Sequence, residues 1–492
     1  MEDLPDVSRE KNEIKKRPQF HFSCPKGWCN DPNGFSFFGN CFHLFYQWHP
    51  YSTVWGSMHW GHASTEDFVN WKILPAALTP DSAFDSEGCF SGTAIDYGGA
   101  HLLCYTGVTN SGGNMIQAQC IAIGDGTKYE KLGSNPVVDK KNVPFEFQVQ
   151  DFRDPKIFKK NGNLYMLCVL KKNDGGGAMV LFRNEPDRKI NGWKFVGTLF
   201  ESADGKTKMW ECPDYFELDG KDTFLFSPQG MTEDFENGFH EGNNSVYTYG
   251  RLDLQDFNFT PQFHNGSFSY AQIDYGIDFY APETTLSPDG RRIMIAWMSS
   301  WESPVTPEDF SWSGMMTFPR ELFFGNERLW QIPVREIERF RKNHRTFEIC
   351  CGSTMSLPVS DPRHFDCEIE FASDGIENDG GFFSIKIGDE KFFASLRYER
   401  KSGLLTFDRT NTIGGGGKIK KRSVKIKPDA EGKISLRILS DTNSLEAFVN
   451  GGELAFTNVF FIPPDSNGLH IKSTVRACVK IDYYEICVED KK

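Results

Sequence analysis

A repeat of about sixty residues constrains the fold of this chain more than any other feature. Five times, an apolar strand is followed by a turn that contains glycine and then by a second strand rich in β-forming residues. The five turns are Gly39-Asn40, Gly98-Gly99, Asn161-Gly162, Asp219-Gly220 and Asp289-Gly290. Turns of this kind between apolar runs indicate β-hairpins. Five such units predict a radial array of sheets, a five-bladed β-propeller over residues 1–333.

A different pattern follows the last repeat. The short amphipathic stretch Val334–Arg341 begins just after Pro333 and predicts a helical linker over residues 334–346. Beyond it, apolar and polar residues alternate in segments such as Phe365–Phe371, which predicts a β-sandwich over residues 347–492. The expected fold is therefore all-β: a five-bladed β-propeller followed by a C-terminal β-sandwich. The run Gly414–Gly417 lacks the residues of a phosphate-binding loop and is expected to form a flexible hairpin tip.

Charge and composition restrict the partners and the location of the chain. The 54 Lys and Arg residues against 67 Asp and Glu give a net charge of −13, which disfavours nucleic acids and anionic membrane surfaces. No apolar stretch approaches the roughly 18 residues of a membrane-spanning helix. The charged residues 1–17 lack the apolar core of a signal peptide, and the 13 cysteines form no CxxC pair. We therefore expect a cytoplasmic protein with reduced thiols, and neither a metal nor a cofactor.

A short polar segment precedes the first strand of each repeat. The five segments are Asn30-Asp31-Pro32-Asn33-Gly34, Ser91-Gly92, Arg153-Asp154-Pro155, Glu211-Cys212-Pro213-Asp214 and Tyr280-Ala281-Pro282-Glu283. An Asp before Pro is, taken singly, most often a turn residue that bonds its own backbone. Equivalent positions in a propeller's repeats, however, lie on one face around the central channel. We therefore expect Asp31, Asp154 and Glu211 to meet in one pocket.

Clustered carboxylates are the groups that glycoside cleavage requires. One carboxylate attacks or stabilises the anomeric carbon, and another, kept protonated by burial and neighbouring negative charge, protonates the leaving oxygen. Aromatic side chains lie close to the polar segments in the sequence, among them Trp55, Phe90 and Trp301. Each of them could stack on the apolar face of a sugar or belong to the core. Gln47 is a candidate partner for a sugar hydroxyl.

Four motifs together resemble the β-fructofuranosidases of glycoside hydrolase family 32, which include invertases, fructanases and sucrose-6-phosphate hydrolases. The motifs are Trp28–Gly34, Phe90-Ser91-Gly92, Arg153-Asp154-Pro155 and Glu211-Cys212-Pro213, and Asp441–Gly452 resembles the sandwich motif of the family. The resemblance implies a hydrolase that releases terminal β-D-fructofuranosyl units from sucrose and short fructo-oligosaccharides. The expected partner is thus a small-molecule sugar. The sequence leaves a monomer and a homodimer equally open.

The resemblance also implies a role for each site residue. Asp31 would be the nucleophile that forms a covalent fructosyl-enzyme intermediate, and Glu211 would be the general acid and then the general base. Asp154, with Arg153 beside it, would hold fructose hydroxyls and stabilise the transition state. Two displacements give retention and require the Asp31 and Glu211 carboxyl groups to lie about 5–5.5 Å apart. The other residues expected in the fructose subsite are Asn30, Gln47, Trp55, Phe90, Ser91, Cys212, Tyr280 and Trp301.

Other functions remain open from the sequence. An inverting arabinan-type glycosidase also combines a five-bladed propeller with three acids, but its carboxyl groups would lie about 6.5–9.5 Å apart. A fructosyltransferase would form the same intermediate and pass the fructosyl unit to another sugar. A sucrose-6-phosphate hydrolase would need a Lys or Arg near the glucose subsite. A non-catalytic sugar-binding propeller is disfavoured because binding alone has no use for three acids.

Overall fold

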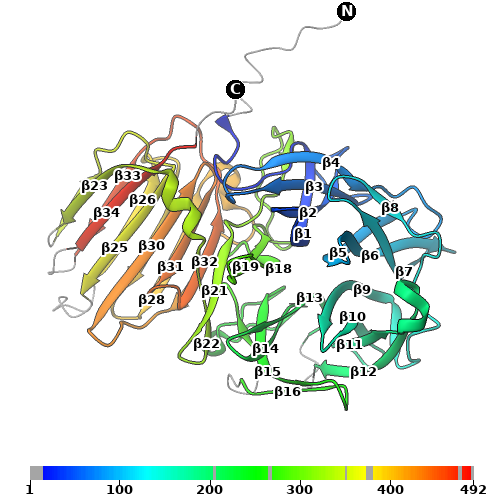
Figure 1. The fold of residues 1–492 in the computed structure, drawn as a ribbon. Coiled ribbons are helices and arrows are strands. Elements are labelled where there is room, and N and C mark those ends of the chain that lie inside the picture. The colour runs from blue at the N-terminus through cyan, green and yellow to red at the C-terminus, as the bar shows by residue number, and fades with distance from the viewer. Residues whose placement is uncertain are drawn as a thin grey trace, which may run out of the picture.

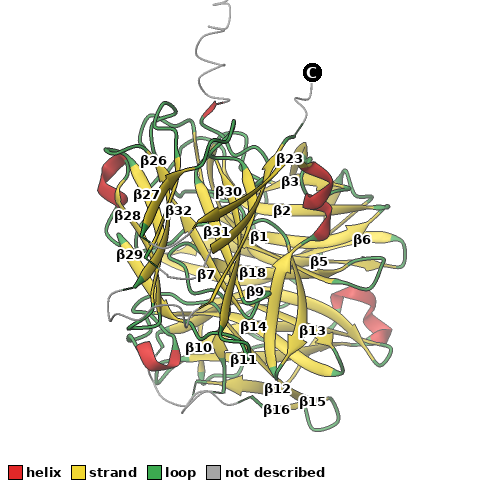
Figure 2. Ribbon diagram, turned by 90° about the vertical axis from the view of Figure 1, so that its left-hand side faces the viewer, coloured by secondary structure: helices red, strands yellow, loops and turns green. Residues whose placement is uncertain are grey.

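Strands dominate the protein, and the predicted all-β class is confirmed. The computed structural model describes residues 15–202, 207–263, 269–349, 352–372, 381–474 and 479–488. The named helical elements are four short 3-10 helices, η1 (Pro186–Asn191), η2 (Phe235–Asn237), η3 (Arg335–Phe340) and η4 (Ile413–Gly416). They connect or flank the strands (Figure 2). None of the helices in the described segments is long and apolar enough to cross a lipid bilayer.

Five antiparallel sheets follow one another along residues 27–333. The first contains β1 (Gly27–Phe38), β2 (Cys41–His49), β3 (His59–Thr65) and β4 (Lys72–Leu78), and the second contains β5 (Gly88–Tyr97), β6 (Ala100–Ser111), β7 (Asn114–Gly124) and β8 (Tyr129–Lys131). The third contains β9 (Phe147–Lys160), β10 (Asn163–Lys172), β11 (Gly177–Asn184) and β12 (Trp193–Glu201). The fourth contains β13 (Met209–Leu218), β14 (Lys221–Gln229), β15 (Val246–Asp253), β16 (Asn258–Pro261) and the short β17 (Ala271–Gln272). The fifth contains β18 (Tyr280–Leu286), β19 (Arg292–Trp297), β21 (Arg320–Gly325) and β22 (Arg328–Pro333).

The first strands of these sheets form a closed ring of contacts. Strand β1 contacts β5, β5 contacts β9, β9 contacts β13, β13 contacts β18, and β18 contacts β1 again. Figure 1 shows the five sheets arranged in chain order around this centre. A short strand late in the chain, β20 (Trp312–Ser313), pairs in parallel with β1 and ties the fifth sheet region to the first. The ring brings the five polar segments of the sequence together.

The polar segments lie inside the first strands. The prediction that they precede these strands is wrong. The register with the second strand shifts at each segment: between Cys29 and Pro32, between Phe90 and Gly92, between Arg153 and Lys156, between Glu211 and Asp214, and between Tyr280 and Glu283. Four of the five segments contain a proline, which cannot donate a ladder hydrogen bond and so favours a bulge, and the fifth, Ser91-Gly92, contains a glycine instead. Asp154, Cys212 and Ala281, each just before a proline, have φ values of 60°, 48° and 52°. Such bulges turn side chains away from the regular alternation of a strand.

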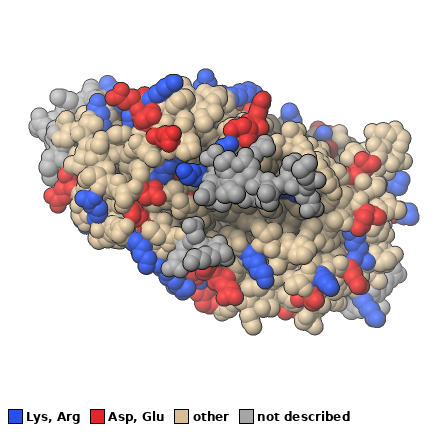
Figure 3. Space-filling view, turned by 90° about the horizontal axis from the view of Figure 1, so that it is seen from above, with Lys and Arg blue, Asp and Glu red and all other residues tan. Residues whose placement is uncertain are grey.

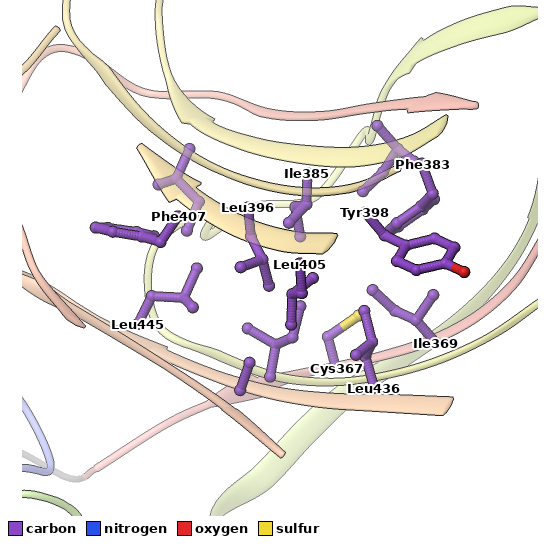
Figure 4. Close-up of a cluster of buried hydrophobic side chains, with 14 of the residues drawn as sticks. Cys367, Ile369, Phe383, Ile385, Leu396, Tyr398, Leu405, Phe407, Leu436 and Leu445 are labelled. Carbon is purple, nitrogen blue, oxygen red and sulfur yellow. The ribbon is translucent and has the colours of Figure 1, made fainter. Parts of the chain in front are cut away.

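Two six-stranded sheets make up the C-terminal part, which we call the C-terminal sheet pair. One sheet has the order β23 (Arg341–Ile349), β34 (Val479–Ile486), β25 (Phe365–Ala372), β30 (Lys433–Asp441), β31 (Ser444–Val449) and β32 (Leu454–Val459). The other has the order β24 (Ser353–Ser356), β33 (Leu469–Ser473), β26 (Phe382–Gly388), β27 (Phe393–Glu399), β28 (Leu404–Asn411) and β29 (Lys421–Lys425). Alternate side chains of both sheets point into a shared apolar core, in which Ile385 and Leu396 face Cys367 and Leu436 (Figure 4). Burial of this face explains the alternating sequence pattern.

The helical linker is shorter than the predicted residues 334–346. Helix η3 ends at Phe340, and Arg341–Ile349 form strand β23, which pairs with β34. The side chains of residues 342–346 are exposed, so a helix there would have no apolar stripe to bury. Hydrogen bonds to the edge of β34 are the better alternative for this segment.

Buried ion pairs join the C-terminal sheet pair to the five sheets. Arg320 on β21 contacts Glu446 on β31 and Asp274, and all three side chains are inaccessible to solvent. His21 bonds Asp441 through one ring nitrogen and Glu446 through the other. Charges in an apolar environment are stable only when they are paired. These pairs therefore fix how the two parts of the protein sit on each other.

Candidate active site

A cavity of about 320 Å³ lies where the first strands of the sheets meet. Ten residues predicted from the sequence line it: Asn30, Asp31, Gln47, Trp55, Phe90, Ser91, Arg153, Asp154, Glu211 and Trp301. Four further residues that the sequence analysis did not select also line it: Gln117, Asp151, Gln229 and Asn243. The cavity is within the size range of small-molecule sites. Charged side chains of both signs are interspersed over the face shown in Figure 3.

Asp31 is buried in the bulge of β1 and is held by three donors. The Ser91 hydroxyl donates to Asp31 Oδ2 at 2.6 Å, the Asn30 amide donates to Oδ1 at 3.1 Å, and the Cys212 thiol lies 3.5 Å from Oδ2. Burial raises the pKa of Asp31, while the hydrogen bond from Ser91 acts in the opposite direction. The indole of Trp28 donates to Asn30 at 2.8 Å and orients the amide. The carboxylate of Asp31 is thus fixed in one orientation.

Glu211 on β13 is held from both sides. Arg153 donates to Glu211 Oε1 through Nε at 3.1 Å and through Nη2 at 2.8 Å. The Tyr280 hydroxyl donates to Glu211 Oε2 at 2.6 Å. Burial raises the pKa of the Tyr280 hydroxyl well above its usual value, so it remains a donor. Asp151 accepts from Arg153 Nη1 at 3.0 Å, so the one guanidinium contacts two carboxyl groups.

Asp154 occupies the strained bulge of β9. Its backbone N–H donates to the Thr106 hydroxyl at 3.0 Å, and its Oδ2 accepts from the Cys212 backbone N–H at 2.9 Å. Burial raises the pKa of Asp154 to about 7; the charge of Arg153 opposes this rise and the charge of Glu211 adds to it. A carboxyl group of this kind changes its protonation near neutral pH.

Two of the predicted residues do not line the cavity and lie behind the acids. The Cys212 thiol lies between Asp31 Oδ2, at 3.5 Å, and Asp154 Oδ2, at 3.7 Å. Burial and the adjacent carboxylates raise the pKa of this thiol well above its usual value, so it keeps its proton. The hydroxyl of Tyr280 reaches Glu211 from the bulge of β18. Both residues therefore contact the acids and not the open space of the cavity.

Aromatic side chains border the opening of the cavity. Trp55 is 45% exposed and Trp301 is 38% exposed, which is unusual for tryptophan. The Trp55 ring packs edge-on against Phe90 at 5.9 Å between centroids, and Trp301 packs against Trp28 and Trp297 at 5.8 and 4.9 Å. Exposed, well-supported rings of this kind are the usual stacking partners of sugars.

Of the four lining residues that the sequence analysis did not select, one could have been identified from a sequence pattern and three could not. Asp151 lies two residues before Arg153 on β9, and alternate residues of a strand share a face, so the strand period could have identified it. Gln117 comes from β7, Gln229 from β14, and Asn243 from the connection that follows it. These positions carry no local motif. Only the packing of the sheets brings them to the cavity.

Comparison with known proteins gives a consistent result for the whole chain. Residues 21–333 match the glycosyl hydrolases family 32 N-terminal domain, and residues 336–485 match the glycosyl hydrolases family 32 C-terminal domain. A sucrose-6-phosphate hydrolase of Escherichia coli is 34% identical over 465 residues, which cover 92% of this chain and 91% of that protein. A raffinose invertase of Escherichia coli is 33% identical over 472 residues, with coverage of 92% and 91%.

A solved structure is similar over almost the same length. The family 32 β-fructofuranosidase of the silkworm Bombyx mori has a TM-score of 0.82 and 30% identity, covering 98% of this chain and 96% of that one. A variant of that enzyme in which an Asp is replaced by Ala has been solved in complex with sucrose. With both family domains matched in order and the acids gathered in one cavity, the chain belongs to glycoside hydrolase family 32 and is a glycoside hydrolase.

Proposed function

We propose that the protein is a retaining β-fructofuranosidase that hydrolyses the terminal β-D-fructofuranoside bond of sucrose and short fructo-oligosaccharides. The observation that carries this proposal is the arrangement of Asp31, Asp154 and Glu211. They come from three different sheets, line one cavity, and are linked by the Cys212 thiol and by Arg153. The sucrose complex of the silkworm relative supports sucrose as the substrate class.

Each acid has surroundings that suit one role. Asp31 would attack the anomeric C2 of the fructosyl unit, because its donors orient the carboxylate and leave it accessible from the cavity. Glu211 would protonate the glycosidic oxygen and then remove a proton from the attacking water. Asp154 would accept hydrogen bonds from fructose hydroxyls. Arg153 would hold Glu211 in place and balance part of the negative charge of the cavity.

Retention rather than inversion is part of this proposal. It requires the Asp31 and Glu211 carboxyl groups to lie about 5–5.5 Å apart, and a water between them would need about 6.5–9.5 Å. Asp31 lies 3.5 Å from the thiol of Cys212, the residue that directly follows Glu211. This proximity favours the shorter separation. The covalent intermediate can be tested by rapid quenching of a sucrose reaction followed by mass spectrometry of the intact protein, which should gain one fructosyl unit that is absent in Asp31→Ala.

The architecture follows the same reasoning. We infer that the five sheets are the blades of a propeller, with the closed contacts between their first strands as support. We further propose that residues 1–333 form this catalytic domain and that residues 347–492 form a β-sandwich. The catalytic cavity would then lie at the axis of the propeller, where equivalent strand positions converge.

A second substrate, sucrose 6-phosphate, has support from the names of relatives such as the Escherichia coli sucrose-6-phosphate hydrolase. The described residues that line the cavity comprise four carboxylic acids, Asp31, Asp151, Asp154 and Glu211, and one cation, Arg153, which is already paired. This charge balance would repel a phosphate within the cavity. Lys208, whose side chain lies beside Gly230 and whose backbone bonds Gln229, is a candidate for a phosphate contact at the rim. We therefore favour the neutral sugars.

Product analysis tests the proposal directly. Wild type and Asp31→Ala are incubated separately with sucrose, 1-kestose, inulin and sucrose 6-phosphate, and free fructose is measured. Release of fructose by the wild type alone would support the proposed reaction. A preference of more than about tenfold in kcat/KM for sucrose 6-phosphate, abolished in Lys208→Ala, would replace the neutral substrate with the phosphorylated one. Absence of fructose release from all four by a folded wild type would refute the proposal.

A further inference from the structure

The C-terminal sheet pair reaches the segment that carries Trp301. This segment lies between β19 and β20. Two residues after Trp301, the fully buried Ser303 contacts the C-terminal sheet pair. Ser303 Oγ accepts a hydrogen bond from the backbone N–H of Ile419 at 2.9 Å. Arg409 on β28 donates through Nη2 to Ser303 Oγ at 3.2 Å and to the Ser303 carbonyl at 3.3 Å. A segment that lines the cavity is thus held from outside the five sheets.

Arg409 also holds a second segment of the first part. Its side chain is inaccessible to solvent, and Nη1 donates to Asp278 Oδ2 at 2.9 Å and to the Val459 carbonyl at 2.8 Å. Asp278 lies two residues before Tyr280, whose hydroxyl bonds Glu211. One guanidinium therefore ties Ser303 and Asp278 together. A planar group with several donors in fixed directions is suited to such a connection, and a lysine could not reproduce it.

The glycine run that follows β28 packs against the same point. The run connects the paired strands β28 and β29, as expected, but Gly416 is buried and does not form an exposed tip. A Cβ atom at Gly417 would lie 2.8 Å from Ser303 Oγ and 2.8 Å from a methyl carbon of Val305. A Cβ atom at Gly414 would contact nothing within 4 Å. Only the end of the run is therefore in close contact with the Trp301 segment.

The residue between Trp301 and Ser303 extends the connection to another part of the cavity. Glu302 Oε1 accepts from the backbone N–H of Asn243 at 2.7 Å, and the Ser300 hydroxyl donates to Glu302 Oε2 at 2.9 Å. Trp301 and Asn243 both line the cavity. Any displacement of Ser303 would therefore move two lining residues together.

We propose that Arg409 and Gly417 of the C-terminal sheet pair are positioning residues for the sugar site, acting through Ser303 on Trp301 and Asn243. The inference rests on the proposed fructofuranosidase function. It gives the C-terminal sheet pair a part in substrate recognition, although none of its residues lines the cavity as described. Since Trp301 would contact bound substrate in the ground state as well as in the transition state, its displacement should affect KM more than kcat.

Two glycine variants test this connection. Gly417→Ala and Gly414→Ala each place an alanine at a positive φ, +69° and +70°, but ψ is −158° at Gly417 and 9° at Gly414, so the backbone strain is larger in Gly417→Ala. Gly414→Ala therefore controls for a substitution within the run, and Ser303→Ala, which adds no strain, controls for the difference. Only Gly417→Ala adds the contact with Ser303. We expect KM for sucrose to rise at least about fivefold in Gly417→Ala with kcat changed less than about twofold, because loss of a contact made equally in the ground state and in the transition state raises KM and leaves kcat unchanged. Gly414→Ala should retain wild-type values of both parameters.

Further variants keep the test decisive. Ser303→Ala removes the hydroxyl that accepts from Arg409 and Ile419 without adding bulk, and leaves only the carbonyl contact with Arg409. It should also raise KM, and it keeps the inference testable if Gly417→Ala fails to fold. In a Trp301→Ala background, Gly417→Ala should raise KM less than it does in the wild type, because only the connection through Asn243 remains and residues that act through one another are not additive. The inference is wrong if KM in Gly417→Ala matches Gly414→Ala, if Ser303→Ala leaves KM unchanged, or if the effects of Gly417→Ala and Trp301→Ala add. Wild type that releases no fructose would instead refute the proposed function itself.

Discussion

The histidine buried between the five sheets and the C-terminal sheet pair should make the protein less stable as the pH rises into the alkaline range. His21 has no exposed side-chain surface, and its ring nitrogens lie 2.8 Å from Asp441 Oδ2 and 2.8 Å from Glu446 Oε1. Burial alone would lower the pKa of His21, but the hydrogen bonds and charges of the two carboxylates outweigh it and raise the pKa to about 9. The native protein therefore holds a proton that the unfolded chain releases near pH 6.5.

The size of the effect follows from this difference in pKa. A histidine whose pKa rises from 6.5 to about 9 on folding stabilises the native state by about 3 kcal/mol, since each pKa unit corresponds to about 1.4 kcal/mol. The sign is that of a raised pKa. The stabilisation is complete below pH 6.5, decreases steadily above it, and is lost once the pH has passed 9. In His21→Gln this dependence should be absent.

Urea unfolding at pH 6.5, 8.0 and 9.5 measures this dependence. The free energy of unfolding of the wild type should fall by about 3 kcal/mol more than that of His21→Gln over this range. His344→Gln is the control, because His344 is an exposed histidine that also bonds an Asp, Asp482. The free energy of unfolding of His344→Gln should change with pH as that of the wild type does. Equal slopes for wild type and His21→Gln would show that the proton is not held as the contacts imply.

Three further predictions concern the acids and a second histidine cluster. Tyr280→Phe removes the hydroxyl that donates to Glu211, and kcat/KM for sucrose should fall about 10- to 150-fold, as expected for a hydrogen bond to a charged group; a change below twofold in steady-state assays would contradict this contact. Glu211→Ala should lower turnover of sucrose by orders of magnitude but lower turnover of a fructoside with a good leaving group far less, and an equal loss on both substrates would exclude the acid role. His62, which is hydrogen-bonded to His43, has a pKa lowered to about 2, chiefly by burial, so the native state excludes a proton that the unfolded chain binds below pH 6.5. The free energy of unfolding, measured with urea, should therefore fall by about 2 kcal/mol between pH 7 and pH 5 because of this residue. The fall should be smaller in His62→Gln, and an identical fall in the two proteins would refute the prediction.

Local sequence patterns were sufficient for the strands and for most of the site. Each hairpin carries its own turn dipeptide, and each first strand carries a polar segment with a proline or, in Ser91-Gly92, a glycine at its bulge, so the repeat could be read without any long-range contact. The all-β class and the lining positions of Asp31, Asp154 and Glu211 follow from these patterns. The helical linker was predicted too long, because the pairing of β23 with β34 depends on a strand more than a hundred residues away.

Tertiary structure alone decided how the two parts of the chain meet and what the supporting residues contact. Nothing near Arg409 or Gly417 in the sequence indicates Ser303, and nothing near Gln229 or Asn243 indicates a cavity. Sequence patterns report on backbone geometry and on which face of a strand is buried, because both are set by neighbours along the chain. Hydrogen bonds between distant segments are set instead by how the sheets pack, and they become visible only when the folded protein brings those segments together.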